Sequence, residues 1–411
     1  MSKYASFALV FAPFLFPYFL PGTTINLEVL FMLINGCVFT FYNYSHNNKA
    51  VWPRFFTVFV IYSFITPLFG FIKYGNGGAI KSTYVSFIPF LLCFVQLPSI
   101  IKWEYIKKYY CKLSYISISF FVVQEFMYYL LGWRLVGLLP FMPVSYSYTT
   151  MGAFIEVMSH LNRSMSFFLE PAHYAQYILG YLAVVLADNS KHGKLLSREA
   201  VVISLALLLT WSGTAILSTL LLWTILFFKL KIRKSIKYGL ILPTVLLCAC
   251  ISFNYIRSTE RGEEIMERKE EMSFQQSRVS SGMIRIFRGF LVYGDMPLDE
   301  KIFGVGTGTI PDVIDHSKFL FMFYDFDRYV NTAQAVLIGG GIVGASFFLL
   351  FLINMAKKKS AYPLFLVSLF IGLSFMEGFW LSGRMLLYLT IASYTAYYKL
   401  VHQKLISKIN I

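Results

Sequence analysis

Charged residues are scarce in this chain of 411 residues, where they make up 14% against 57% hydrophobic residues. Soluble domains carry about 25% charged residues, so the scarcity excludes a soluble globular protein. The excess of apolar residues likewise excludes a disordered chain. With a mean hydropathy of +0.62, the composition predicts an all-α, polytopic integral membrane protein.

Cysteine is also scarce, and none of the five cysteines lies in a long polar loop. Four of them fall in apolar runs, and their spacing fits neither a disulfide framework nor a metal site. The usual motifs of soluble enzymes are missing as well: the sequence contains no Walker A loop, no HExxH, no GxSxG and no CxxC. We therefore expect no metal site and no cofactor.

Acidic residues are outnumbered, with 21 Asp and Glu against 36 Lys and Arg and a net charge of +15. In a soluble protein this excess would suggest a nucleic-acid partner. In a membrane protein, basic residues gather in cytoplasmic loops and set the orientation, and some contact lipid phosphates. We expect the lipid bilayer as a partner and no nucleic acid.

Apolar runs long enough to cross a bilayer recur along the whole chain and predict about 12 membrane segments. The chain divides into N-terminal helices (1–132), a first extracytoplasmic loop (133–172), central helices (173–256), a long extracytoplasmic loop (257–332) and C-terminal helices (333–411). Both termini are expected in the cytoplasm of a bacterium, with the protein in its cytoplasmic (inner) membrane.

The run 200–228 is long for one span and short for two. If it were one span, the basic cluster 229–234 would fall outside the cell. If it breaks into two short helices at Ser212 and Gly213, that cluster returns to the cytoplasm, as the positive-inside rule requires. Non-helical backbone inside a membrane is tolerated only beside protein or a wet cavity. The break therefore points to a functional cavity.

The long loop 257–332 contains a predicted amphipathic helix over 280–294. Arg285 and Arg288 interrupt its apolar face, and Arg278 stacks on Arg285 at a spacing of seven residues. Such a helix suits the membrane–water interface, where anionic headgroups lie. The glycine-rich stretch 304–308 lacks the Lys-Ser/Thr of a P-loop, and we interpret it as the turn that closes this helix.

The string FFLEPAHYAQY over 167–177 is the most informative part of the sequence. Glu170 stands before a proline at the mouth of a span, where it can cap the following helix. Glu170, His173 and Gln176 share one helix face, and His173 is either a general base or a hydrogen-bond partner. Arg163 lies just upstream.

This string resembles the F-x-E-P-S/A signature of Wzy-type oligosaccharide repeat-unit polymerases, in the O-antigen polymerase/ligase family of integral-membrane glycosyltransferases. Three further stretches, 209–214, 302–308 and 331–344, resemble other motifs of the family in the expected order. Val330 stands where ligases of the family carry a histidine, and Gly213 stands where an arginine is common. The missing histidine favours a polymerase over a ligase.

The resemblance implies polymerisation of undecaprenyl-pyrophosphate-linked oligosaccharide repeat units into a surface polysaccharide, on the outer face of the membrane. Lipid pyrophosphate would be the leaving group, bound by arginine side chains. Glu170 or His173 would activate the acceptor hydroxyl. Looser candidates are Asp312, Asp315, His316, Asp325 and Asp327. The predicted pyrophosphate ligands are Arg163, Arg278, Arg285 and Arg288, and the predicted substrate contacts are Gln176, Asn331 and Asp325. The flippase and chain-length regulator proteins of the same pathway are the expected protein partners.

Two alternative functions remain open. One is an O-antigen-type ligase that transfers finished glycan to another acceptor. The other is a transporter or flippase for lipid-linked sugars, which needs a charged pathway across the membrane. The predicted spans contain few ionisable groups and show no clear inverted repeat, so polymerase is the preferred interpretation.

Overall fold

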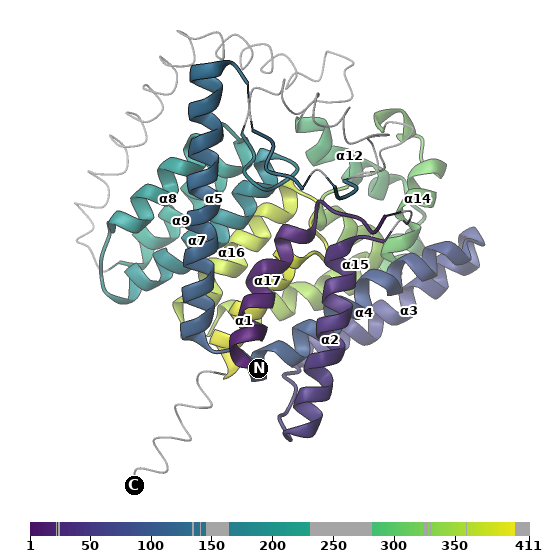
Figure 1. The fold of residues 1–411 in the computed structure, drawn as a ribbon. Helices are drawn as coiled ribbons and strands as arrows, with labels where there is room; N and C mark the ends of the chain where they lie inside the picture. Colours follow the sequence, from purple (N-terminus) through teal and green to yellow (C-terminus); the bar gives the residue numbers. More distant parts are fainter. Residues whose placement is uncertain are drawn as a thin grey trace.

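The computed structural model describes residues 1–21, 23, 25–133, 135–139, 141–144, 164–230, 282–323, 328, 330–358 and 360–398, with the backbone alone at 282–285 and 398. Within these residues the fold consists of helices joined by short connections and contains no strand, only two isolated β-bridges. The all-α prediction is confirmed for this part of the chain (Figure 1).

The N-terminal helices are α1 (Ser2–Phe11), α2 (Leu27–Ser45), α3 (Arg54–Tyr74), α4 (Gly77–Ile100) and α5 (Trp103–Leu131), with the short 3-10 helix η1 (Ala12–Leu15) after α1. The central helices are α7 (Pro171–Lys191), α8 (Arg198–Leu208) and α9 (Gly213–Lys229). The segment after position 281 forms α12 (Gly282–Asp295), α13 (Leu298–Phe303) and α14 (Ile310–His316), and the C-terminal part forms α15 (Thr332–Ala356), α16 (Ala361–Met376) and α17 (Gly383–Ser393).

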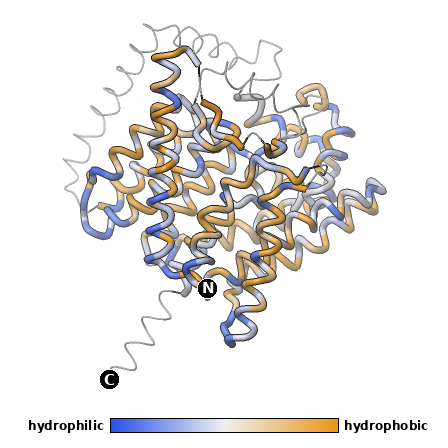
Figure 2. The backbone as a smooth tube through the Cα atoms, in the orientation of Figure 1, coloured by the Kyte–Doolittle hydropathy of each residue, from blue (hydrophilic) through white to orange (hydrophobic). Residues whose placement is uncertain are grey.

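Five of these helices, α2, α3, α4, α5 and α15, are long and apolar enough to cross a membrane. Hydrophobic residues follow the helices along their length, and hydrophilic residues gather where helices end (Figure 2). The protein is a membrane protein, as its composition predicts. The count of 12 segments, their division into domains and their orientation stay predictions.

Helix α7 forms the centre of the bundle. Every residue from 174 to 187 is buried, which is typical of a helix surrounded by protein on all sides. Gly180 makes this packing possible, because a Cβ there would lie 2.3 Å from Tyr110 Oη and 2.4 Å from Tyr388 Cε1. Close packing of α5 and α17 on the middle of α7 therefore depends on this glycine.

The predicted break in the run 200–228 is confirmed. Helix α8 ends at Leu208 and α9 begins at Gly213, with Ser212 as its N-terminal cap residue. The two helices fold back on each other, because Trp223 Nε1 of α9 donates a hydrogen bond to Ser204 Oγ of α8 at 2.9 Å. Both short helices pack against α7.

The predicted amphipathic helix is present as α12, which is strongly amphipathic. Its apolar face is used for packing against protein: Val292 is buried in a cluster with Val305 and Ile338, and Phe290 stacks with Phe375 of α16. A hydrogen bond of 2.6 Å from Gln334 Nε2 to the carbonyl of Ile286 ties it to α15.

The glycine-rich stretch does not close α12, so this prediction is wrong. The short helix α13 intervenes, and the glycines instead pack against a kink in α15 at Gly341, whose φ is +60°. Gly306 N donates to Gly339 O at 2.8 Å, and a Cβ on Gly304 would lie 2.4 Å from that same oxygen. The two chain segments approach backbone to backbone, which only glycine permits.

Candidate active site

Three helices begin around one short connector, residues 377–382, which joins α16 to α17. Thr332, the first residue of α15, donates from its backbone N and from Oγ1 to the carbonyl of Glu377, at 2.9 and 3.0 Å. Thr214, the second residue of α9, donates from Oγ1 to Glu377 Oε1 at 2.7 Å. Ser382 caps α17 by accepting from Met385 N. The starts of α9, α15 and α17 therefore meet at this connector.

The start of α7 joins them through Arg384, the second residue of α17. Arg384 Nη1 donates to Gln176 Oε1 at 2.6 Å, and Tyr388 Oη donates to the backbone carbonyl of Gln176. Four helix N-termini thus lie at one end of the bundle, which we call the site end. Each N-terminus carries a partial positive charge. Asn331 and Ser382 cap α15 and α17, but the combined helix dipoles still favour anionic ligands.

Backbone strain is concentrated in the same connections. Ser166, Trp211 and Leu381 have positive φ values of +54°, +51° and +57°, a conformation that costs non-glycine residues about 1–3 kcal/mol each. They lie in the connections leading into α7, α9 and α17. Strain of this kind clusters at functional sites, and here it marks three of the four helix starts.

Glu170 lies immediately before α7 and is exposed. Its backbone carbonyl accepts from Tyr174 N at 3.1 Å and so starts the helix, but its side chain makes no capping hydrogen bond. The predicted capping role is wrong, because Pro171 fixes the first turn without it. The carboxylate therefore remains accessible at the mouth of the site end.

His173 and Gln176 lie deeper on the same helix. The His173 ring packs edge-on against Phe16 with centroids 5.1 Å apart, and its buried Nδ1 has no hydrogen-bond partner among the described residues. Gln176 is 1% exposed; its Oε1 accepts from Arg384, while its Nε2 has no partner in the described part of the chain. His173 and Gln176 are thus linked through Arg384 and Phe16, because the Arg384 guanidinium donates to Gln176 and lies over the Phe16 ring that His173 contacts.

Arg288, a predicted pyrophosphate ligand, is 1% exposed. Its guanidinium lies over the ring of Phe323 at 4.4 Å and donates from Nη1 to the carbonyl of Met322 at 3.4 Å. Arg285 belongs to the first turn of α12, without a described side chain, and Arg163, Arg278 and Asp325 lie outside the described residues. The convergence of the four arginines stays a prediction.

Asn331, a predicted substrate contact, is fully buried and caps α15. Its Oδ1 accepts from Gln334 N at 2.9 Å, and Gln334 Oε1 accepts from Asn331 N at 3.0 Å, which completes a capping box. Its Nδ2 donates to the carbonyl of Phe375 at 2.9 Å. The side chain of Asn331 is therefore used within the protein, where it fixes the start of α15.

Three charged residues of the site end were not among the predicted site residues: Arg384, Glu377 and Glu28. Glu28 is 2% exposed in the first turn of α2, within electrostatic reach of Arg384, and a Cβ on Gly383 would lie 2.6 Å from its Oε1. Each is an isolated charge in or beside an apolar run, which is a reason to suspect function in a membrane protein. Among the described residues, no three His, Cys, Asp or Glu side chains cluster as metal ligands would.

The central helices carry the match to known proteins. Residues 115–272 match the family model described as WcaD colanic acid polymerase. The matched stretch covers less than half of the chain and includes α7, the broken pair α8 and α9, and the entry to α7 with Glu170. No curated protein matches the sequence. The predicted resemblance to oligosaccharide repeat-unit polymerases is confirmed by this match.

Proposed function

We propose that the protein is a membrane glycosyltransferase that polymerises oligosaccharide repeat units carried on undecaprenyl pyrophosphate. A hydroxyl of one lipid-linked glycan attacks the anomeric carbon of another. The new glycosidic bond forms as the bond from that carbon to the phosphate oxygen breaks. The lipid pyrophosphate leaves with the bonding electrons, and the proton of the hydroxyl passes to a base. The donor bond is already activated, so the reaction needs no sugar nucleotide.

The convergence of four helix N-termini at the connector 377–382 carries this proposal. A pyrophosphate group needs positive potential that is fixed before it arrives. Each N-terminus contributes about 0.3–1 kcal/mol toward a nearby anion, so four of them leave a substantial part of the binding to arginine. Arg285, in the first turn of α12, is the candidate that follows, because α12 packs on the start of α15. Arg288 is 1% exposed, and its guanidinium contacts Phe323 and Met322 within the protein.

Glu170 is the preferred base. Its carboxylate is exposed at the mouth of the site end and is not used for capping α7, so it is available to accept a proton from a sugar hydroxyl. His173 is the second candidate, since its Nδ1 has no partner among the described residues. Glu170 would act from the position just before α7, and His173 from the first turn of the helix.

The distribution of basic residues supports an outward-facing site end. At the opposite end of the bundle, where α5 begins and α7 ends, lie Lys107, Lys191 and Arg198, and the nearby starts and ends of helices add Lys102, Lys108, Lys194, Lys229, Lys357 and Lys358. Such an excess is typical of the cytoplasmic side. The N-terminus belongs to that end, because Lys3 lies 5.7 Å from the ring of Tyr105.

The decisive experiment is a reaction of the purified protein with a synthetic lipid-pyrophosphate repeat unit. We expect a ladder of lipid-linked polymers from the wild-type protein and none from Glu170→Gln. Failure of correctly folded wild-type protein to extend the repeat unit would overturn the proposal. In cells, gene removal should leave lipid-linked single units on the outer face of the membrane. Accumulation on the cytoplasmic face would instead indicate a flippase.

A further inference from the structure

Arg384 is a buried cation held by three separate parts of the chain. It is 1% exposed. Its Nη1 donates to Gln176 Oε1 of α7 at 2.6 Å, and its Cζ lies 4.4 Å above the ring of Phe16, just after η1. Glu28 of α2 lies within its electrostatic reach. Burying a guanidinium is costly unless its charge and donors are compensated, and these contacts supply part of that compensation.

Phe16 connects Arg384 to His173. One set of contacts places the guanidinium over the Phe16 ring, and another places the His173 ring edge-on against it, with centroids 5.1 Å apart. The backbone of Phe16 is itself fixed, because its carbonyl accepts from Asn26 Nδ2 at 2.9 Å. His173 therefore packs on a ring whose position depends on both Asn26 and Arg384.

Gln176 provides the second connection to the start of α7. Its side chain accepts from Arg384, and its backbone carbonyl accepts from Tyr388 one turn further along α17. Two adjacent turns of α17 thus hold one residue of α7, six positions beyond Glu170. The orientation of this part of α7 decides where Glu170 and His173 face.

We propose that Arg384 is a positioning residue for polymerisation, which holds the start of α7 through Gln176 and Phe16 and so fixes His173 and Glu170 toward the acceptor hydroxyl. The part of this inference that concerns the reaction rests on the proposed function. Arg384 is too deeply buried to touch the substrate itself. A planar guanidinium can stack on a ring while donating in its plane, and a lysine ammonium cannot reproduce that combination.

Removing the buried charges of both Arg384 and Glu28 distinguishes a loss of positioning from the destabilisation caused by one unpaired buried charge. Arg384→Gln alone leaves Glu28 as an uncompensated buried carboxylate, which destabilises the fold. The double variant Glu28→Gln/Arg384→Gln removes both charges, so we expect its abundance in membranes to recover toward that of the wild type. Its kcat should still be about 100-fold lower at nearly unchanged KM, because a displaced catalytic group slows the chemical step more than binding. Arg384→Lys should restore little of the kcat.

Hydrogen exchange gives a readout that does not depend on activity. Residues 172–178 should exchange faster in the double variant than in the wild type, while residues 181–191 of the same helix should be unchanged. The matched control is Lys191→Met, which removes a cation lying 3.6 Å over the Tyr362 ring at the other end of α7. This variant should keep the wild-type kcat and the wild-type exchange of 172–178.

Two results would overturn the proposal: a wild-type kcat per folded molecule in the double variant, or unchanged exchange in 172–178. Because exchange is measured whether or not polymer forms, the two proposals fail separately. Absence of polymer from wild-type protein counts against the proposed function, whereas an unaltered start of α7 counts against Arg384 as its positioning residue.

Discussion

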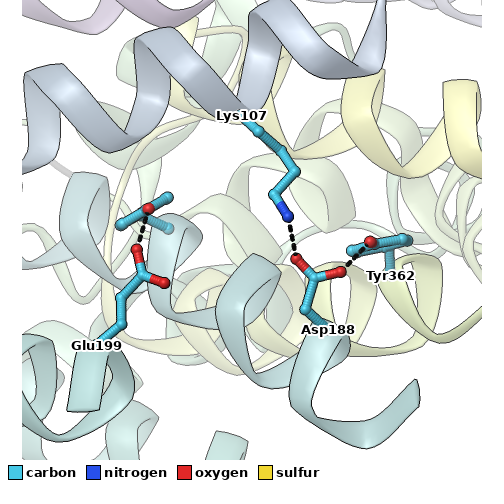
Figure 3. Close-up of polar contacts among 5 residues, drawn as sticks. Lys107, Asp188, Glu199 and Tyr362 are labelled. Carbon is cyan, nitrogen blue, oxygen red and sulfur yellow. Dashed lines mark hydrogen bonds and ion pairs between the residues drawn. The ribbon is translucent and has the colours of Figure 1, made fainter. Parts of the chain in front are cut away.

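The polar side chains at the two ends of helix α7 differ in whether they are hydrogen-bonded. At the end opposite the site, both oxygens of Asp188 are used: Oδ2 pairs with Lys107 Nζ at 2.6 Å, and Oδ1 accepts from Tyr362 Oη (Figure 3). At the site end, Glu170 is exposed without a capping bond, and the buried Nδ1 of His173 has no partner among the described residues.

The difference separates a structural end from a functional one. Buried polar groups in native proteins are nearly always satisfied, and an unsatisfied group asks for an explanation. Around Asp188 the explanation is stability, since Tyr181 Oη also donates to Glu199 and Lys191 lies over the Tyr362 ring. At the site end, unsatisfied groups and positive φ values occur together. Proteins tolerate such destabilising features mainly at functional sites.

The middle of α7 joins the two ends, so a disruptive substitution there should unfold the protein and abolish both its stability and its activity. We expect Gly180→Val to abolish accumulation of folded protein, because its side chain would clash with Tyr110 and Tyr388, both fully buried. The cost should exceed the roughly 1–3 kcal/mol typical of overpacking. Membrane abundance and detergent thermal stability measure this. Gly294→Val is the control, since a Cβ there meets nothing within 4 Å, and a stable Gly180→Val protein would contradict the close packing of α7.

Glu170→Gln should affect the site end alone. The exposed side chain contributes no capping bond, so membrane abundance should equal that of the wild type. Loss of the basic oxygen should lower polymer formation by about 100-fold or more, the usual contribution of a general base. Initial rates with the lipid-pyrophosphate repeat unit measure the effect. Full activity would show that the carboxylate is not the base and would direct attention to His173.

Asp188→Ala should affect the opposite end alone. Tyr362 Oη loses its acceptor, which we expect to cost about 1–3 kcal/mol of stability. The ion pair adds little, because the Lys107 side chain is 44% exposed. Turnover per folded molecule should stay at the wild-type level, measured after normalising to protein that survives a thermal challenge. A fall in kcat without loss of stability would show that the two ends are coupled.

The smallest effect should come from the ion pair between Lys318 and Asp295, which lies at the end of α12. Hydrogen bonds from Lys318 to Asp295 lower the pKa of this carboxyl below its ordinary value. The stabilisation is therefore fully present above the ordinary pKa, near 4, and is lost as the pH falls through the lower folded value. Asp295→Asn should melt slightly below the wild type at pH 7, and the difference should shrink as the pH falls below about 4. A difference that persists at low pH would assign it to another cause.

Local patterns in the sequence predict much of the fold. Glu170-Pro171 marks the start of α7, Ser212-Gly213 marks the break before α9, and the apolar face with arginines over 280–294 predicts α12. These features depend on residues close together in the chain, because helix hydrogen bonds join residues four positions apart. The glycine-rich stretch was misassigned for the opposite reason: its partner is the kink at Gly341, far along the chain.

The sequence by itself determined a helical membrane protein, the start of α7, the break before α9 and the resemblance of its central region to polysaccharide polymerases. Only the tertiary structure decided which helix starts meet and which charges are buried together. Arg384 and Gln176 are 208 positions apart, and Thr214 and Glu377 are 163 apart. Such pairs depend on the rotation and tilt of every packed helix between them, which periodicity along one helix does not specify.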